Sequence, residues 1–384
     1  MSAPSPESAG LTDTHRAFAE TCRRFARERI APHVVEWEEA GSFPRSLYTE
    51  AAEAGILGVS FPEAYGGGGG DLLHSMLSVE TLLEGGSSGL VASLGSLGIA
   101  LPPIMALGTE EQKQRFVPKV LSGEHIAALA ITEPGAGSDV AGVKTRAVRD
   151  GDHYRLSGAK LFITSGVRAD LVTVLARTGE DAHGGLTFFV VERGTPGFSA
   201  SRALNKTGWW ASDTAELSFD DVKVPLDQRL GEEGSGFLAI MQSFQAERLS
   251  LAFYGHATAE IVLADAIAYA KERQAFGRPL TGFQVTRHKL AEMATKTRVA
   301  KAFNWELARR VAAGEYLVTE VSMAKNFAAQ VAQEVCYEAV QIFGGMGYMR
   351  ETRVERFARD ARLLPIGGGT TEIMNEIIAK QLGL

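Results

Sequence analysis

The chain has 384 residues, of which 45% are hydrophobic and 22% charged, and its formal net charge is −7. This is the composition of an ordinary globular protein, and the length predicts two or three structural units. Because no block of basic residues is present, we expect no nucleic-acid partner. No apolar run approaches the roughly 18 residues that cross a bilayer, so we expect no membrane span.

The two cysteines, Cys22 and Cys336, are far apart and lack the spacing of a zinc site. We expect both to be reduced thiols, in the core or at the surface, of a cytoplasmic protein without a metal site. The first ten residues, MSAPSPESAG, are small and polar and contain no apolar core region. They are interpreted as a loose tail and not as a signal peptide.

The first 124 residues are predicted to be helical. Residues 12–39 are rich in Ala, Arg and Glu, and their apolar positions recur at roughly the helical period. Residues 61–71, FPEAYGGGGGD, interrupt this pattern, because Pro62 and five glycines cannot hold a helix. We interpret them as a flexible surface loop between helices.

Between residues 125 and 233 the pattern changes to short β-branched or alternating segments, bounded by turn signals such as DGD, HGG and GTPG. These segments are HIAALAIT, YRLSGAKLFIT, DLVTVLAR, LTFFVVER and TAELSFDDVKV. They predict an antiparallel β-barrel or sandwich of about 100 residues. Long helical patterns return over residues 234–384, so the expected fold class is a multidomain α+β protein in the order helical, β, helical.

Two glycine-rich segments are candidate ligand contacts. ITEPGAGSDVAG, residues 131–142, leads into further strands and does not open a helix in a βαβ unit, so it is no dinucleotide fingerprint. A glycine turn between strands can still bring backbone N–H groups close to a ligand. QIFGGMGY, residues 341–348, interrupts a helical pattern and is either a helix end or a second close-approach site.

Two other segments carry single candidate residues. Thr164 ends a strand in LFITSG, residues 161–166, where its alternative role is a local bond to the backbone. Arg273, Phe276 and Gln284 lie in KERQAFGRPLTGFQ, residues 271–284, between two helical stretches. Each of them is a candidate ligand contact or a routine loop residue.

Glu247 stands out within a helical pattern. At helical spacing it shares a stripe with the apolar residues Ile240, Phe244, Leu251 and Tyr254. A carboxylate on an apolar stripe must be solvated, paired or used in chemistry. From the residues alone, a paired structural glutamate and a functional one both remain open.

Together, these motifs closely resemble the acyl-CoA dehydrogenase family, from the N-terminal helices to the last helix. The segments that carry the resemblance are ITEPGAGSDVAG, GAKLFITSG, GWWASDTAELSFDDVKVP, GEEGSGF, ERQAFGRPL with Gln284, QIFGGMGY and RDARLLPIGGGTTEI. The resemblance implies an α-helical N-domain (1–124), a central β-domain (125–233) and a C-terminal four-helix bundle (234–384). It also implies non-covalent FAD, a homotetramer built as a dimer of dimers, and an electron-transferring flavoprotein as electron acceptor.

The resemblance also implies which residues hold the cofactor. Phe162 matches a position that is usually Trp and packs on the flavin, and Thr164 matches a hydroxyl near flavin N5. Arg273, Phe276, Gln284 and the 341–345 stretch match contacts to the FAD of a neighbouring subunit. The full set of implied cofactor residues is Leu129, Ile131, Thr132, Gly137, Ser138, Phe162, Thr164, Arg273, Phe276, Gln284, Gln341, Gly344, Gly345, Thr370 and Glu372.

The implied reaction is α,β-dehydrogenation of an acyl thioester, in which a carboxylate removes the α-proton and flavin N5 accepts the β-hydride. Many family members carry that carboxylate just before Gly-Thr in the C-terminal loop, where this chain has Gly368. The isovaleryl and long-chain branches carry it in a Glu-Arg pair on a helix, which Glu247 and Arg248 match. The resemblance therefore makes Glu247 the base, and we expect Arg248 to point away from it.

Gly368 is then left with a backbone role. Its N–H is expected to bind the thioester carbonyl beside a ribityl hydroxyl of FAD, because the enolate oxygen must be stabilised for so weak an acid to lose its proton. The expected substrate contacts are Ser138, Phe244, Arg248 and Gly368. Glu133 and Glu372 are the alternative bases.

Other activities remain open at this stage. The nearest alternative is the same chemistry on an acyl chain held by an acyl or peptidyl carrier protein in secondary metabolism. A flavin oxidase or oxygenase is another alternative. A non-catalytic, DNA-associated flavoprotein is disfavoured by Glu247 and by the negative net charge. Acyl chain length does not follow from the sequence, because helix packing sets the depth of the pocket.

Overall fold

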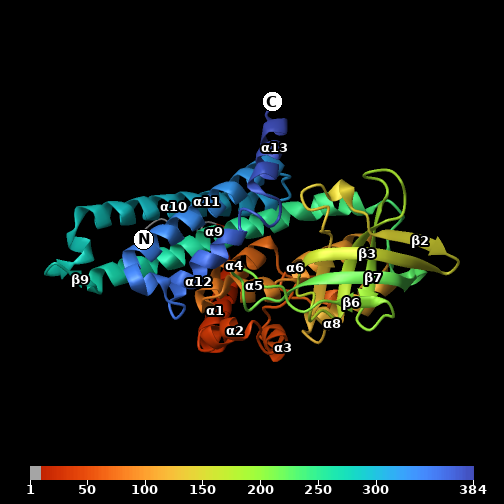
Figure 1. The fold of residues 1–384 in the computed structure, drawn as a ribbon, viewed down its shortest axis with the longest axis horizontal. Coiled ribbons are helices and arrows are strands. Elements are labelled where there is room, and N and C mark those ends of the chain that lie inside the picture. The colour runs from red at the N-terminus through yellow and green to blue at the C-terminus, as the bar shows by residue number, and fades with distance from the viewer. Residues whose placement is uncertain (1–9) are drawn as a thin grey trace.

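The computed structural model describes residues 10–384, apart from the side chain of Gln242. Nearly all of the expected loose tail, residues 1–9, lies outside the described residues. The described chain forms a helical region, a β-sheet region and a second helical region in that order (Figure 1). The predicted fold class is therefore confirmed.

The N-terminal region is built from helices. They are α1 (Asp13–Phe25), α2 (Val34–Ala40), α3 (Ser46–Glu53), α4 (Leu72–Leu82), α5 (Ser88–Leu94), α6 (Leu97–Ala100), α7 (Pro102–Leu107) and α8 (Glu110–Leu121). Thr12 caps α1, because its side chain accepts a hydrogen bond from the His15 N–H. A π-helical turn, Ala26–Ile30, follows α1 directly, so the predicted helical stretch over residues 12–39 is close to continuous.

The glycine run at 66–70 is a surface loop between helices, as expected, but it is tied to its neighbours. The Gly70 N–H donates to the Val59 carbonyl at 2.8 Å, and the Gly69 N–H donates to the Phe61 carbonyl at 2.9 Å. A Cβ on Gly67 would lie 2.2 Å from the Phe61 oxygen. The flexible-loop interpretation is therefore corrected: glycine allows two backbone segments to approach closely.

The central region is one eight-stranded sheet in the order β6-β7-β3-β2-β4-β5-β8, with β1 paired to β4. Its strands are β1 (Ala127–Ala130), β2 (Arg146–Asp150), β3 (His153–Thr164), β4 (Leu171–Arg177), β5 (Leu186–Glu192), β6 (Phe198–Ala200), β7 (Thr214–Pro225) and β8 (Arg229–Leu230). The five predicted strand segments are present as β1, β3, β4, β5 and β7. The sequence did not predict β2, β6 and β8.

Of the two predicted alternatives, a barrel or a sandwich, the strands form no closed barrel and a sandwich-like arrangement fits. One detail of the prediction is wrong: the sheet is not wholly antiparallel, because β1 runs parallel to β4 and β2 meets β4 at one parallel pair. The physical reason is the connection between β1 and β4. Parallel neighbours need a long crossover, and here that crossover contains the β2–β3 hairpin.

The C-terminal region is a helical bundle. Its long helices are α9 (Gly236–Glu272), α10 (Gln284–Ala312) and α11 (Val318–Phe343), which pack on one another. Between α9 and α10 lies a small hairpin, β9 (Gln274–Ala275) and β10 (Arg278–Pro279). The shorter α12 (Arg353–Asp360) packs on α9 and α11, whereas α13 (Thr371–Gln381) packs on α11 and stands out from the body (Figure 1).

Helix α9 is long and apolar enough to cross a membrane by length and composition alone, which qualifies the expectation of no span. Its most apolar window is 61% buried. Helices α4, α10 and α11 pack against it. These contacts are those of a core helix.

Both cysteines are free and buried, so the predicted reduced thiols belong to the core. Burial raises the pKa of Cys22 to about 12 and also raises the pKa of Cys336. Neither thiol is therefore a reactive nucleophile.

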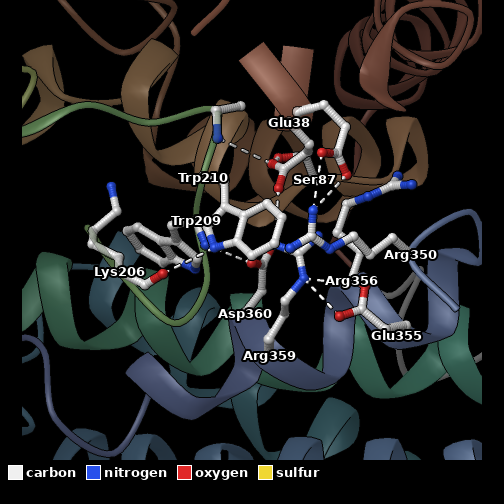
Figure 2. A network of polar contacts seen from close by, with 12 residues as sticks. Glu38, Ser87, Lys206, Trp209, Trp210, Arg350, Glu355, Arg356, Arg359 and Asp360 are labelled. Atoms are coloured by element: carbon white, nitrogen blue, oxygen red, sulfur yellow. Dashed lines mark hydrogen bonds and ion pairs between the residues drawn. The ribbon is translucent and has the colours of Figure 1, made fainter. Parts of the chain in front are cut away.

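Glu38 on α2 joins the three regions through a buried polar network, shown in Figure 2. Its carboxylate accepts hydrogen bonds from the Ser87 hydroxyl at 2.6 Å and from the Ala211 N–H at 3.3 Å. It also forms an ion pair with Arg359 of α12 at 3.3 Å. The guanidinium of Arg359 lies 3.6 Å from the centre of the Trp210 ring. Each region therefore contributes a partner to one carboxylate.

Asp360, at the end of α12, is a second buried carboxylate of this network and is 0% exposed. It accepts hydrogen bonds from the Trp209 N–H at 2.6 Å and from the Ser88 N–H at 3.1 Å. We call Glu38, Asp360 and Arg359 the junction cluster. Because all three groups are partnered, the cluster fixes the orientation of the three regions.

Candidate active site

Glu247 lies on α9 and faces a narrow cavity between the three regions. The cavity is lined by Gly98, Ile99, Pro103, Leu129, Ile131, Phe188, Ile240, Ser243, Phe244 and Glu247. Its free volume is about 20 Å³, which is room for about one water molecule. An acyl chain that entered here would have to displace side chains. The predicted stripe of Ile240, Phe244 and Glu247 therefore does face one space.

The carboxylate of Glu247 has no polar partner. Within the described residues it accepts no hydrogen bond and forms no ion pair, including with Arg248. Burial raises the pKa of Glu247, and the more distant charges of Arg248 and Lys325 oppose that rise. A carboxylate that is partly buried, unpaired and facing a cavity suits a general base whose pKa must approach the working pH.

Gly368 lies opposite Glu247. A Cβ at position 368 would be 3.7 Å from Oε1 of Glu247 and 2.3 Å from Cδ1 of Leu251. The φ angle of Gly368 is +64°, in the left-handed region that favours glycine. Within the described chain, no group accepts a hydrogen bond from the Gly368 N–H. This free donor beside an unpaired carboxylate is what the resemblance led us to expect.

Arg248 points away from Glu247, as expected. Its Nε lies 3.4 Å from the Gly368 carbonyl oxygen, and its guanidinium lies 5.1 Å from the centre of the Phe244 ring. It borders a second cavity, of about 210 Å³, between α9, α11 and α13. Burial lowers the pKa of Arg248, and the carboxylate of Glu247 opposes that shift. A cavity that contains a cation suits the polar end of a charged substrate.

The expected flavin-side residues lie on the sheet near the first cavity, the one that Glu247 faces. Leu129 and Ile131 line it directly. The Thr132 carbonyl accepts a hydrogen bond from the Leu161 N–H at 2.8 Å, which places the segment after β1 beside the end of β3. Phe162 lies at this end of β3, where the strand pairing is irregular. Its side chain is 64% exposed, and its φ angle is +61°.

These residues fit a flat cofactor. The Phe162 ring is exposed, and Cβ atoms built on Gly135 and Gly137 would meet nothing within 4 Å. Ser138 is exposed beside them, and Thr164 is the last residue of β3, two residues after Phe162. An exposed ring at a strained backbone position, with open glycine backbone nearby, is the arrangement that a planar ligand requires.

The remaining cofactor residues form two other groups. Thr370 caps α13 with its side chain, and Glu372 is exposed in the first turn of that helix. The second group is exposed at the far end of the bundle, at and around β9, opposite the sheet (Figure 1). It contains Arg273, Phe276, Gln284, Gln341, Gly344 and Gly345.

The far-end group is held together by this chain alone. Tyr269 of α9 stacks on Phe343 of α11 with ring centres 4.2 Å apart, which brings the end of α11 beside the β9–β10 hairpin. Phe276 on that hairpin is 97% exposed and has a φ of +52°. This group is far from β3, the strand that carries Phe162, because β9 and the sheet lie at opposite ends of the molecule (Figure 1).

The alternative bases are occupied or exposed. The carboxylate of Glu133 accepts hydrogen bonds from Lys160 Nζ at 2.9 Å and from the backbone N–H groups of Lys144 and Thr145 at 2.7 and 2.9 Å. Although burial raises its pKa, these contacts lower the pKa of Glu133 overall. Glu372 is exposed, and contacts with its own N–H and with Thr370 lower its pKa. Neither is suited to be the base.

Sequence reasoning missed Lys325, a buried lysine of α11 whose Nζ donates to the Gly369 carbonyl at 2.6 Å. It also missed four other residues that line the cavity: Gly98, Ile99 and Pro103 of the N-terminal region, and Ser243 of α9. A signal for Lys325 was available, because it interrupts a stripe of small residues that contains Val321, Ala324 and Ala328. No comparable signal marks the cavity residues.

Family models cover almost the whole chain. Those described as the acyl-CoA dehydrogenase N-terminal, middle and C-terminal domains match residues 12–124, 128–222 and 234–383. The chain therefore belongs to the acyl-CoA dehydrogenase family, and it is a flavin-dependent oxidoreductase.

Similar proteins include the long-chain specific acyl-CoA dehydrogenase of mouse mitochondria, which is 40% identical over 98% of this chain and 90% of its own length. A solved structure described as a probable acyl-CoA dehydrogenase from Mycobacterium abscessus is 54% identical. Its TM-score is 0.96, and the match covers 97% of this chain and 100% of that one.

Three further solved structures bear on cofactor and partners. A Mycobacterium smegmatis glutaryl-CoA dehydrogenase in complex with FADH2 has a TM-score of 0.91 at 31% identity, over 97% of this chain and 95% of its own. The prolyl acyl carrier protein oxidase AnaB has a TM-score of 0.91 at 32% identity, over 98% and 100%. A chain from work on the electron-transferring flavoprotein of Acidaminococcus fermentans has a TM-score of 0.94 at 38% identity, over 97% and 99%.

Proposed function

We propose that the protein oxidises the Cα–Cβ bond of an acyl-CoA thioester to the trans-2-enoyl thioester, with Glu247 as the base that removes the α-proton. The observation that carries the proposal is an unpartnered, partly buried carboxylate that lines a cavity, together with Gly368 close by, whose backbone N–H has no acceptor within the described chain. When bound, FAD would supply the acceptor for the β-hydride.

The site residues would then have the following roles in the reaction. The Gly368 N–H donates to the thioester carbonyl, so that negative charge can develop on that oxygen as the α-proton leaves. Glu247 takes the proton on a carboxylate whose pKa burial has raised. Arg248 binds the polar carrier end, and Phe244 and Ser138 contact the substrate. The apolar cavity excludes water from the reacting atoms.

Each FAD would be bound by residues of two neighbouring subunits. The flavin side would be held by Leu129, Ile131, Thr132, Gly137, Ser138, Phe162 and Thr164, with Thr370 and Glu372 toward the phosphate and ribose. The far-end group around Phe276 would contact the FAD of a neighbouring subunit, because one chain keeps it apart from Phe162. We therefore propose a homotetramer built as a dimer of dimers, in the cytoplasm, with an electron-transferring flavoprotein as acceptor.

Substrate oxidation and assembly can be measured on the purified holoenzyme. A panel of acyl-CoA thioesters of different length and branching, with a dye as electron acceptor, should identify at least one substrate that yields the 2-enoyl product. Light scattering should give a species larger than one chain with one FAD per chain. No product with any acyl-CoA, or a monomer that is fully loaded with FAD, would contradict the corresponding part of the proposal.

The second candidate keeps the chemistry and changes the carrier of the acyl group. It is favoured by the similarity to the acyl carrier protein oxidase AnaB along nearly the whole chain. The two candidates differ in the second cavity, where Arg248 and Lys380 would meet an anionic nucleotide or only a phosphopantetheine arm. Comparing the same acyl group on CoA and on a carrier protein decides between them by kcat/KM.

A further inference from the structure

Lys325 is a buried lysine beside the proposed base. Its side chain is 0% exposed, on the face of α11 that packs against the bundle. Nζ donates to the Gly369 carbonyl at 2.6 Å, and within the described residues it forms no ion pair. Burying an ammonium group without a carboxylate in contact is costly. A methionine of similar shape would avoid that cost, so the charge itself is the feature to explain.

The hydrogen bond of Lys325 acts on the backbone that presents Gly368. Gly368 and Gly369 both have positive φ angles, +64° and +98°, and glycine backbone is intrinsically free to rotate. Two neighbouring residues of α11 contact the backbone on either side of Thr370. Lys325 donates to the Gly369 carbonyl, and Asn326 Nδ2 donates to the Thr371 carbonyl at 3.1 Å. The direction of the Gly368 N–H therefore depends on contacts from α11.

The charge of Lys325 acts on Glu247. The groups with which Lys325 interacts electrostatically are Glu247 and Arg248 from α9 and Glu372 from α13. Burial, and then the positive charge of Arg248, lower the pKa of Lys325 to about 8, and the two carboxylates oppose that shift. Lys325 is thus protonated below about pH 8, in the range where a carboxylate base must be ionised to work.

We propose that Lys325 is a positioning residue for the dehydrogenation: its hydrogen bond to Gly369 fixes the loop that carries the Gly368 N–H, and its positive charge keeps Glu247 ionised. The proposal rests on the proposed function, in which Glu247 is the base. Arg248 supplies a second positive charge nearby, but it interacts with the carrier end of the site and with Tyr316. Lys325 instead donates its hydrogen bond to the Gly369 carbonyl and so stays beside the loop.

The test compares Lys325→Met and Lys325→Gln with wild type and with Asn326→Ala, all as FAD-loaded holoenzymes. Asn326→Ala is the matched control, because it removes a neighbouring anchor of the same loop without removing a charge. The first readout is kcat/KM for one acyl-CoA against pH. The second is amide hydrogen exchange of residues 366–371, which does not depend on turnover.

Removal of the charge should raise the pKa of Glu247 further and move the acid limb of the profile to higher pH. We expect kcat/KM of Lys325→Met to be roughly tenfold below wild type at about pH 6.5 and within about twofold at about pH 9, where Lys325 is neutral in wild type as well. Exchange in the loop should be faster in both Lys325→Met and Asn326→Ala, but only the lysine variants should shift the acid limb.

An acid limb that is unchanged in Lys325→Met and Lys325→Gln would overturn the charge role, and unchanged loop exchange would overturn the anchoring role. Should the Met variant fail to fold, Lys325→Gln, which keeps a neutral donor, carries the test alone. Failure of the proposed function is distinguishable, because it appears as full activity in Glu247→Ala whatever the lysine variants do.

Discussion

The junction cluster and the cavity that Glu247 faces surround their carboxylates in opposite ways. At the junction cluster, Glu38 is paired with Arg359 and accepts two further hydrogen bonds, and Asp360 accepts two backbone N–H groups. At the cavity, Glu247 has no partner among the described residues. A buried charge is costly unless it is compensated, so only the junction cluster has the composition of a structural device.

A raised pKa does not separate the two places. Burial, and next the carboxylate of Glu38, raise the pKa of Asp360 to about 7, and burial raises the pKa of Glu247 as well. What differs is the surroundings: two N–H groups donate to Asp360, whereas Glu247 lines a cavity and no donor within the described chain contacts it. Missing partners, rather than a shifted pKa, mark the reactive carboxylate.

The largest effect is expected from substitutions of Glu247, the unpartnered carboxylate. Glu247→Ala should lower kcat/KM by roughly 10²–10⁴-fold, and Glu247→Gln by a similar factor, because Gln keeps the shape but not the basicity. Neither variant loses a polar partner, so folding and FAD content should be kept. Steady-state assays with a dye acceptor, together with the flavin absorbance of the purified variants, measure both. Loss of FAD in both variants would instead assign Glu247 a structural role.

The structural role of the junction cluster is tested by removing the carboxylate of Asp360. Asp360→Ala leaves the N–H groups of Ser88 and Trp209 buried without acceptors and should cost about 3–5 kcal/mol of unfolding free energy. Chemical denaturation of the holoenzyme, followed by circular dichroism, measures it. An exposed aspartate such as Asp13 supplies the control, because its pair with Arg16 lies at the surface and its removal should cost less than about 1 kcal/mol. An equal loss of unfolding free energy in the two variants would contradict a structural role of Asp360.

A smaller effect is expected at Arg248, which is neither well partnered like the junction cluster nor without a partner like Glu247. It touches the Gly368 carbonyl only at 3.4 Å, and its charge is directed toward the second cavity. Arg248→Ala should lower kcat/KM roughly 10- to 150-fold, mostly through KM, since a charge-assisted bond to the carrier end is lost. Unchanged kinetics with acyl-CoA would remove Arg248 from the substrate site.

The smallest effect is a partial gain of activity. Adding Gly368→Glu to Glu247→Ala places a carboxylate where many family members carry theirs. The new side chain must accept a φ of +64° and displace Cδ1 of Leu251, so we expect recovery of only about tenfold. Glu247→Ala with Gly368→Gln carries the same strain without a base and should recover nothing; equal rates in the two double variants would contradict the shared position of the two carboxylates.

Motifs in the sequence predicted the parts of this structure that depend on local pattern. Helices, the strand-rich centre and the stripe through Glu247 all follow from periodicity, and Gly368 from its place before Gly-Thr. Pairing across the chain was not predictable in this way. The parallel alignment of β1 with β4 depends on a crossover of some forty residues, from about residue 131 to 170, and the partners of Glu38 come from three separate segments.

The same limit applies within the site. Sequence alone left Glu247 open between a paired and a reactive carboxylate, because pairing depends on residues far along the chain. It could not show that Glu133 is held by Lys160 while Glu247 has no partner. Lys325 was missed for a related reason: its one polar partner is a backbone carbonyl 44 residues away.

Proton abstraction by Glu247 is tested most directly in the reductive half-reaction, in which enzyme-bound flavin loses its absorbance when it is mixed with saturating acyl-CoA in the absence of an electron acceptor. This single turnover separates the chemical step from product release. In wild type the loss of absorbance should be fast, and its rate should rise with pH as Glu247 ionises. In Glu247→Ala it should be slower by roughly 10²–10⁴-fold. Bleaching of Glu247→Ala at the wild-type rate would show that another group takes the proton, and would contradict the assignment of Glu247.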